Sequence, residues 1–226
     1  QLDRAKLDEE ILGRAIAEGV DVLRPAKVFE VDLQWPVSRV SIREESEERT
    51  VTTRWVVDAS GRQAMLARKM GLWERTERHP TAAAWARFKG CADLDGPEVM
   101  GSDPRHSSLP PLLASRRLAT NHFTGYGWWC WTIPLEGGET SVGVVYDKRI
   151  FHWPSEGTQR ERFEAFVKEQ PGLRELLVDA EIDGDDFKAL QHLPYCTRRT
   201  LGLGWASVGD AAAFLDPFYS PGLDHC

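Results

Sequence analysis

The sequence predicts a mixed α/β fold of the α+β type, built from two parts. The first part opens with a helix-like segment and several short β-like runs, and a strand-rich middle carries a helical insertion before a last short strand follows. The chain of 226 residues is 42% hydrophobic and 28% charged, which is the composition of a globular protein. A chain of this length buries one sizeable core or two small ones.

The first part begins with an amphipathic helix. Apolar residues recur at helical spacing between Asp3 and Gly19, where Asp3 is placed to cap the start and Gly19 to follow the end. We therefore expect a helix that packs through its apolar stripe. The charged segment 44–48 is expected to be an exposed hairpin tip. Short β-like runs follow the helix at about 20–23, 26–33, 37–43 and 50–57.

The run at 50–57 leads into Asp58-Ala59-Ser60-Gly61-Arg62, and a helix-like stretch extends from there to about Gly71. Small residues let a backbone approach a ligand closely, and glycine adopts conformations that other residues avoid. Turns of Asp, Ser and Gly between a strand and a helix are also common for structural reasons alone. Taken by itself, this motif leaves both interpretations open.

The middle of the chain, about residues 76–200, is predicted to be mainly β-structure. A Glu-Gly-Gly-Glu turn at 136–139 is expected to join two strands as a hairpin. The β-like runs lie at about 82–89, 118–123, 126–135 and 140–146, with a loop at about 96–116. Two helices are expected at about 156–169 and 172–179, separated at Pro171.

Three tryptophans crowd into four residues of the run at 126–135. Alternation along a strand places Trp129, Trp131 and Ile133 on one face and the intervening residues on the other, and both faces are apolar enough to be covered. A buried central strand would account for such a cluster on its own. The Ile133-Pro134 that follows and the downstream turn favour a face that lines a functional site.

The segment near residue 210 carries the strongest chemical signal. A short β-like run ends in Gly209-Asp210, and a turn containing Pro217, Ser220 and Gly222 follows and opens a further helix. The Asp210 carboxylate is suited to accept hydrogen bonds from sugar or ribityl hydroxyls, and free backbone N–H groups near Gly222 are suited to the pyrimidine edge of a flavin. The pattern therefore indicates a flavin site.

Charge and composition exclude several other classes of function. The formal net charge of −7 argues against a nucleic-acid surface, and no apolar run approaches the length that spans a membrane. The six histidines and four cysteines are scattered without the spacing of a metal site, and the cysteine usage suits a reduced, cytoplasmic protein. Because the chain starts at Gln1 and ends at Cys226 without a stop signal, we expect it to be an internal piece of a longer protein.

Four segments in order resemble the flavin-dependent halogenases of the tryptophan-halogenase type. They are Asp3–Asp8, Asp58-Ala59-Ser60-Gly61, the W-x-W-x-I-P motif at Trp129–Pro134, and Gly209-Asp210-Ala211 through Gly222. W-x-W-x-I-P is the most specific of these, whereas G-D-A is shared with many aromatic hydroxylases and prenyl-lipid reductases. The resemblance implies a partial FAD-binding dinucleotide domain formed by residues 1–75 and 201–226, and an antiparallel-sheet substrate domain formed by residues 76–200.

The resemblance also implies an activity and roles for individual residues. In the family, reduced FAD, O₂ and halide give hypohalous acid, which halogenates an electron-rich aromatic substrate, free or bound to a carrier protein; a flavin reductase supplies the reduced cofactor. The residues implied at the active-site lining are Trp129, Trp131, Ile133 and Pro134, with the two tryptophans keeping the substrate away from the flavin. Those implied in cofactor binding are Arg4, Asp58, Gly61, Gly209, Asp210, Pro217, Ser220 and Gly222.

The chain departs from the family pattern in three respects. The glycine-rich FAD fingerprint and the lysine that directs the oxidant are both expected upstream of residue 1. The residue before the loop glycine, commonly Ser or Thr in the family, is Pro221, which has no backbone N–H to offer a halide. An FAD-dependent hydroxylase or a prenyl-lipid (geranylgeranyl-type) reductase on the same fold is therefore the alternative, and a truncated non-catalytic fragment is the third reading.

Overall fold

The computed structural model describes residues 4–96 and 116–224. The chain divides into two compact units. Unit 1 consists of Gln1–Leu7 and Pro80–His192, and unit 2 of Asp8–His79 and Leu193–Cys226. The mixed α/β fold with antiparallel sheets is confirmed, whereas the domain boundaries expected near residues 76 and 200 stay a prediction. No helix in the described ranges is long and apolar enough to cross a membrane.

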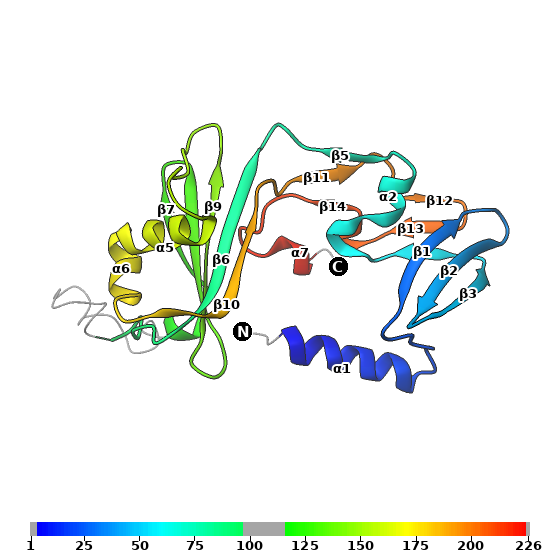
Figure 1. Ribbon diagram of the computed structural model, residues 1–226, viewed down its shortest axis with the longest axis horizontal. Coiled ribbons are helices and arrows are strands. Elements are labelled where there is room, and N and C mark those ends of the chain that lie inside the picture. The colour runs from blue at the N-terminus through cyan, green and yellow to red at the C-terminus, as the bar shows by residue number, and fades with distance from the viewer. Residues whose placement is uncertain (1–3, 97–115, 225–226) are drawn as a thin grey trace. The chain divides into compact units, whose positions relative to one another are not determined.

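Unit 1 is built on a five-stranded antiparallel sheet with the strand order β10-β6-β9-β8-β7 (Figure 1). The hairpin between β8 and β9 closes where the Leu135 N–H donates to the carbonyl of Glu139, at 2.7 Å, as the Glu-Gly-Gly-Glu pattern predicted. The strands are β6 (Thr81–Lys89), β7 (Asn121–Gly125), β8 (Trp128–Pro134), β9 (Thr140–Asp147) and β10 (Glu181–Leu190).

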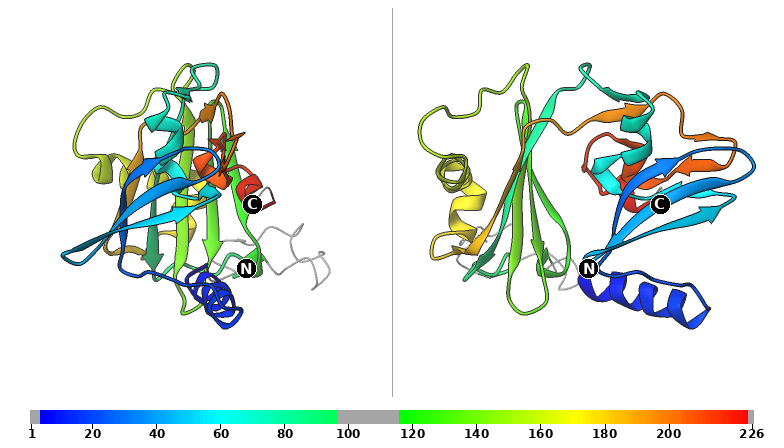
Figure 2. Two further views of the ribbon diagram at one scale, coloured as in Figure 1. Left: turned by 90° about the vertical axis from the view of Figure 1, so that its right-hand side faces the viewer. Right: turned by 45° about the vertical axis from the view of Figure 1, so that its right-hand side comes forward.

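Two helices, α5 (Gln159–Glu169) and α6 (Pro171–Leu176), cover one face of this sheet (Figures 1 and 2). Thr158 and Glu161 form a capping box that starts α5, and Pro171 occupies the first turn of α6, where a missing N–H costs nothing. The buried helix residues pack on the alternate strand residues that point toward them. The helices contribute Phe163, Phe166 and Leu173, and the strands contribute Phe88, Cys130, Val142 and Val144.

The described part of unit 2 contains three small sheets. The meander β1-β2-β3 is antiparallel, and the second sheet, β12-β13-β4, holds a parallel pair between β13 and β4. The third sheet has the order β14-β11-β5. Val31, Leu66 and Trp205 form the buried core that joins the meander, the helix α2 and β13. The element bounds are β1 (Lys27–Asp32), β2 (Ser38–Glu44), β3 (Glu47–Thr53), β4 (Val56–Asp58), η1 (Gly61–Gln63), α2 (Met65–Lys69), β5 (Trp73–Arg75), β11 (Tyr195–Thr197), β12 (Leu201–Gly202), β13 (Trp205–Ser207), η4 (Gly209–Ala211), β14 (Ala213–Phe214) and α7 (Pro221–Asp224).

Two expectations for the N-terminal segment are wrong. The helix α1 (Arg4–Ala17) forms, but it buries none of its side chains, and Ile11 and Ile16 are more than half exposed. Helical spacing specifies an apolar stripe without specifying its partner, and no described element covers this one. Residues 20–23 form no strand because no neighbouring strand pairs with them. The Asp3 cap lies outside the described residues.

Smaller differences concern strand boundaries. The run at 50–57 divides into β3 and β4, which belong to different sheets, because the Thr53 hydroxyl binds both the N–H and the carbonyl of Trp55 and turns the chain between them. The run at 118–123 moves to β7, since a short 3₁₀ turn, η3 (Arg116–Leu118), precedes it. Most of the expected loop at 96–116 lies outside the described residues. The strands β5, β10 and β11 were not foreseen.

Candidate functional site

The turns of the two small-residue motifs lie side by side in unit 2. The parallel strands β4 and β13 pair so that Asp58 is opposite Ser207, and the Val208 N–H donates to the carbonyl of Asp58 at 3.0 Å. Both segments then leave the sheet at the same edge, through η1 after β4 and through η4 after β13. The carboxyl ends of adjacent parallel strands are where α/β folds bind ligands. Sequence alone placed each motif at a strand end but did not show that the two strands are neighbours.

Asp58 holds its own turn together. Its side chain is 2% exposed, and its two oxygens accept backbone N–H groups from Ser60, at 2.9 Å, and Leu66, at 2.7 Å. These bonds satisfy donors at the start of the short helical segment, as an N-cap does. Gly61 follows with a φ of +61° and open space where a side chain would begin. Each oxygen of the Asp58 carboxylate therefore already accepts a backbone N–H, and the backbone at Gly61 is open to a ligand.

Asp210 differs from Asp58 in this respect. It lies in η4 behind Gly209, which has a φ of +54°, and its carboxylate accepts no hydrogen bond from the part of the chain that the structure describes. A Cβ placed on Gly222 would lie 4.0 Å from Asp210 Oδ1, so the structure brings Asp210 and the start of α7 together. The predicted site residues Gly209, Asp210 and Gly222 thus share one location.

The loop between them has an unusual backbone. Tyr219 and Ser220 both have positive φ angles, +61° and +55°, which residues with a side chain seldom adopt. The Ser220 N–H donates to the carbonyl of Pro217 at 2.9 Å, and the Phe218 N–H donates to Asp216 Oδ1 at 3.0 Å. These bonds close the turn on which Pro217 and Ser220, both predicted at the cofactor, lie.

Tyr195 binds the backbone of the Asp210 turn, and the sequence did not predict this contact. Its ring is 2% exposed, and its hydroxyl donates to the carbonyl of Asp210 at 2.5 Å. The Arg62 guanidinium lies 5.0 Å from the ring centroids of both Tyr195 and Phe214, and so ties the turn after β4 to β11 and β14. Burial is the main cause that raises the pKa of Tyr195 to about 12, so the hydroxyl remains a donor at physiological pH.

In unit 1, the residues of the W-x-W-x-I-P motif occupy β8 with the predicted alternation. Cys130 and Thr132 are buried, with Cys130 in the core beneath the helices, while Trp129 and Trp131 are half-buried on the other face. The two indole centroids are 5.7 Å apart, and the His122 ring lies 5.5 Å from that of Trp129. Burial lowers the pKa of His122, so this residue is neutral at pH 7 and not a ready proton donor.

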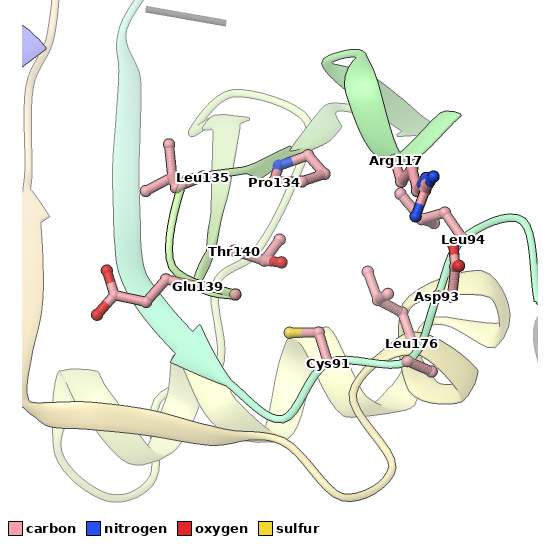
Figure 3. Close-up of a pocket in the computed structure, with 11 residues that line it drawn as sticks. Cys91, Asp93, Leu94, Arg117, Pro134, Leu135, Glu139, Thr140 and Leu176 are labelled. Atoms are coloured by element: carbon pink, nitrogen blue, oxygen red, sulfur yellow. The ribbon is translucent and has the colours of Figure 1, made fainter. Parts of the chain in front are cut away.

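Pro134 ends β8 at the rim of a small pocket in unit 1 (Figure 3). The pocket has a volume of about 150 Å³, and Cys91, Arg117, Glu139 and Thr140 contribute to its wall. Burial raises the pKa of the Cys91 thiol, an effect opposed by its hydrogen bond with Thr140. The thiol is therefore protonated at neutral pH and is a poor nucleophile. Ile133 lies one residue earlier on β8, on the face of the two tryptophans.

Arg4 is the predicted cofactor residue that belongs to unit 1. It is exposed at the start of α1, in a segment assigned to unit 1, whereas the remaining cofactor residues lie in unit 2. Its role stays a prediction. Within 4–96 and 116–224, no group of three or more His, Cys, Asp or Glu side chains is arranged to hold a metal.

The protein is a two-part α/β protein of the ligand-binding type. One part has two strand-to-turn junctions at one sheet edge, and the other has an antiparallel sheet with aromatic residues on one face. The chain belongs to the tryptophan halogenase family, whose model matches residues 1–226.

Individual relatives agree with this assignment. The chain is 30% identical to the flavin-dependent halogenase chlA of Dictyostelium discoideum, covering 99% of this chain and 39% of that protein. It is 29% identical to the 1H-pyrrole-2-carbonyl-[peptidyl-carrier protein] chlorinase of Pseudomonas fluorescens, over 98% of this chain and 46% of that protein. The crystal structure of halogenase PltM in complex with phloroglucinol and FAD shares the fold with a TM-score of 0.83 at 21% identity, over 98% of this chain and 43% of that one. The chain thus spans less than half the length of these relatives.

Proposed function

We propose that the protein containing this chain is an FAD-dependent halogenase, an oxidoreductase of the monooxygenase type that uses reduced flavin and O₂. The observation that carries the proposal is the half-buried carboxylate of Asp210 near the paired strand ends, which accepts no hydrogen bond from the described residues, in a chain that matches the halogenase family along its whole length. Curated relatives named as flavin-dependent halogenases support the same reading.

The residues at the paired strand ends fit FAD in their donor and acceptor chemistry. Asp210 offers two acceptor oxygens for sugar or ribityl hydroxyls, and the turns at Gly61 and Gly209 let the cofactor approach the backbone. The loop from Pro217 to Gly222 would lie along the ring system. When bound and reduced, FAD would supply two electrons to O₂; one oxygen atom would then oxidise halide to hypohalous acid, and the other would leave as water. Asp58 would act at the cofactor by ordering the turn that its carboxylate binds.

Trp129 and Trp131 would line the substrate side of the active site together with Ile133 and Pro134. The half-buried indoles present an apolar surface that favours an aromatic substrate and excludes water. We propose an electron-rich aromatic small molecule as substrate, free or attached to a carrier protein, as in the chlorinase relative whose name specifies a carrier-bound pyrrole. A flavin reductase and a halide would be the partners. The location would be the cytoplasm, which suits the free cysteines among the described residues.

One observation favours an FAD-dependent hydroxylase as a second candidate. Residue 221 is a proline, so the backbone N–H that family members with Ser or Thr would offer to a halide is missing. A hydrogen bond to a charged group contributes about 1.5–3 kcal/mol, which is a factor of roughly 10–100 in anion affinity. The loss weakens halide binding without affecting the acceptor chemistry of Asp210.

The cofactor proposal is tested by FAD titration of the full-length protein followed by flavin fluorescence. Asp210→Ala is expected to raise the dissociation constant for FAD about 10- to 100-fold, because it removes a charged acceptor. Asp185→Ala, on a fully exposed carboxylate in β10, is the control and should leave it unchanged. Failure of the unmodified protein to bind FAD would refute the proposal.

The reaction is tested with reductase-supplied reduced FAD, O₂ and bromide on a panel of phenols and pyrroles, with products identified by mass spectrometry. A brominated product supports the halogenase, and an oxygenated product formed independently of bromide supports the hydroxylase. Pro221→Ser restores an N–H and should lower the KM for bromide by about 10-fold or more. Pro154→Ser, in an exposed loop of unit 1, is the control and should leave the KM for bromide unchanged.

A further inference from the structure

The face of the unit 1 sheet opposite the helices carries a cross-strand row centred on Gly143. In β6, β9 and β8, the residues Trp85, Gly143 and Trp131 are direct partners, so their side-chain positions share one face. Trp85 and Trp131 are both half-buried. A glycine thus lies between two indoles, in a strand whose other residues are Thr, Ser, Val, Tyr and Asp.

Glycine is needed at position 143 because a side chain would collide with a neighbour, and not because the backbone conformation demands it. Its φ is not positive, but a Cβ at this position would lie 2.1 Å from Cζ2 and 2.3 Å from Cη2 of the Trp131 indole. Real Cβ atoms do not approach so closely, so the indole of Trp131 lies across the backbone of β9 in the space that a side chain would fill. Any other residue at 143 would force this ring to move.

Ser141 fixes the same indole at its polar end. The Trp131 Nε1–H donates to Ser141 Oγ at 3.1 Å, and Ser141 lies two residues before Gly143 on the same face of β9. The ring is therefore held at two points, by a hydrogen bond at its nitrogen and by a flat backbone surface under its six-membered ring. A buried indole nitrogen commonly requires such a partner.

We propose that Ser141 and Gly143 are positioning residues that set the orientation of Trp131 and thereby the shape of the substrate side of the active site. This inference rests on the proposed function for its catalytic meaning. Neither residue touches the substrate or cofactor in this proposal; both act through the indole.

The positioning is tested without cofactor by the ¹⁵N–¹H signal of the Trp131 indole, assigned by its loss in Trp131→Phe. Ser141→Ala is expected to shift the signal and to speed solvent exchange of the indole proton about 2- to 12-fold, the range expected for one neutral hydrogen bond. Ser141→Thr keeps the oxygen and should preserve both values. Gly143→Ala should displace the signal as well.

The functional part is tested by the KM for the aromatic substrate in the FAD-loaded, full-length protein. Gly143→Ala is expected to change this KM by about 2- to 12-fold, and to have no further effect once Trp131 is replaced by Leu. Gly125→Ala is the matched control: it creates the same kind of collision with Trp128, a Cβ contact of 2.3 Å, on the helix-covered face. It should lower the melting temperature without changing KM or the Trp131 signal.

The outcomes separate the inference from the function on which it rests. An unchanged Trp131 signal in Ser141→Ala and Gly143→Ala overturns the positioning, whatever happens to activity. A displaced signal with an unchanged KM overturns its link to the substrate. If the protein binds no FAD, the proposed function fails, while the indole signals still decide whether Ser141 and Gly143 orient Trp131.

Discussion

Replacing Asp58 should destabilise unit 2 strongly, and this expectation follows from the hydrogen bonds of one buried carboxylate. Both oxygens accept backbone N–H groups, and the Leu66 donor belongs to a residue with no exposed surface. A hydrogen bond to a charged group contributes about 1.5–3 kcal/mol, so Asp58→Ala removes two and should cost about 3 kcal/mol or more. Such a loss is a large share of the ~5–15 kcal/mol that stabilises a typical domain.

Asp58→Asn gives a graded version of the same perturbation. The amide keeps one oxygen acceptor and loses the other, so we expect a loss of about 1.5–3 kcal/mol. Urea unfolding measures the change, and amide hydrogen exchange of Leu66 locates it, because this N–H becomes exchangeable when its acceptor disappears. Asp185→Asn is the surface control and should stay within about 0.5 kcal/mol of the unmodified protein.

Asp58 does not hold this turn together if Asp58→Asn leaves both the unfolding midpoint and the hydrogen exchange of the Leu66 amide unchanged while FAD affinity falls. That result would make Asp58 a direct cofactor ligand, as the resemblance to the halogenases implied. A fall in FAD affinity that merely follows the loss of stability agrees with the structural role.

Three further perturbations test the packing of unit 1. Hydrogen bonds from Lys188 and Arg87 lower the pKa of Asp186 to about 2. The ionised carboxylate therefore stabilises the fold above about pH 4, and this stabilisation is lost as the pH falls toward 2. In Asp186→Asn, the free energy of unfolding should fall by about 1–2 kcal/mol less between pH 4 and pH 2 than in the unmodified protein. Thr158→Ala breaks the capping box of α5 and should cost about 1 kcal/mol in urea unfolding. Burial raises the pKa of Cys130, so iodoacetamide at pH 8 should leave this thiol unmodified until the protein is denatured, as mass spectrometry will show.

The sheet of unit 1 was largely predictable because its strands carry strong local patterns. Alternation at Trp128–Pro134 correctly separated a core face from an outer face, and the glycine turn at 136–139 set the hairpin. The strand β10 was missed because its sequence is acidic and contains Gly184, whose φ is +55°, at a break in register with β6. It pairs with β6, and Arg87 of that strand binds Asp186 across the pair, a contact 99 residues apart in sequence.

The candidate site in unit 2 was predictable in its parts but not in its assembly. Both small-residue turns were recognised at strand ends, yet nothing local in the sequence states that β4 and β13 are parallel neighbours. Tyr195 gave no signal at all, since a single aromatic residue in a three-residue strand has no periodicity to distinguish it. Only tertiary pairing places its hydroxyl against the carbonyl of Asp210.

Asp58 and Asp210 show why residue type and position in a motif are insufficient to assign a binding role. Both lie at or just after the end of a short strand and precede an alanine, and the resemblance placed both at the cofactor. The two residues differ in their hydrogen-bond partners. Both oxygens of Asp58 accept backbone N–H groups, whereas the Asp210 carboxylate accepts no hydrogen bond from the described residues. Substituting the first should therefore change the unfolding free energy, and substituting the second should change the dissociation constant for FAD. Because the two effects are measured independently, a pair of single variants decides whether this edge of the sheet is built to hold a flavin.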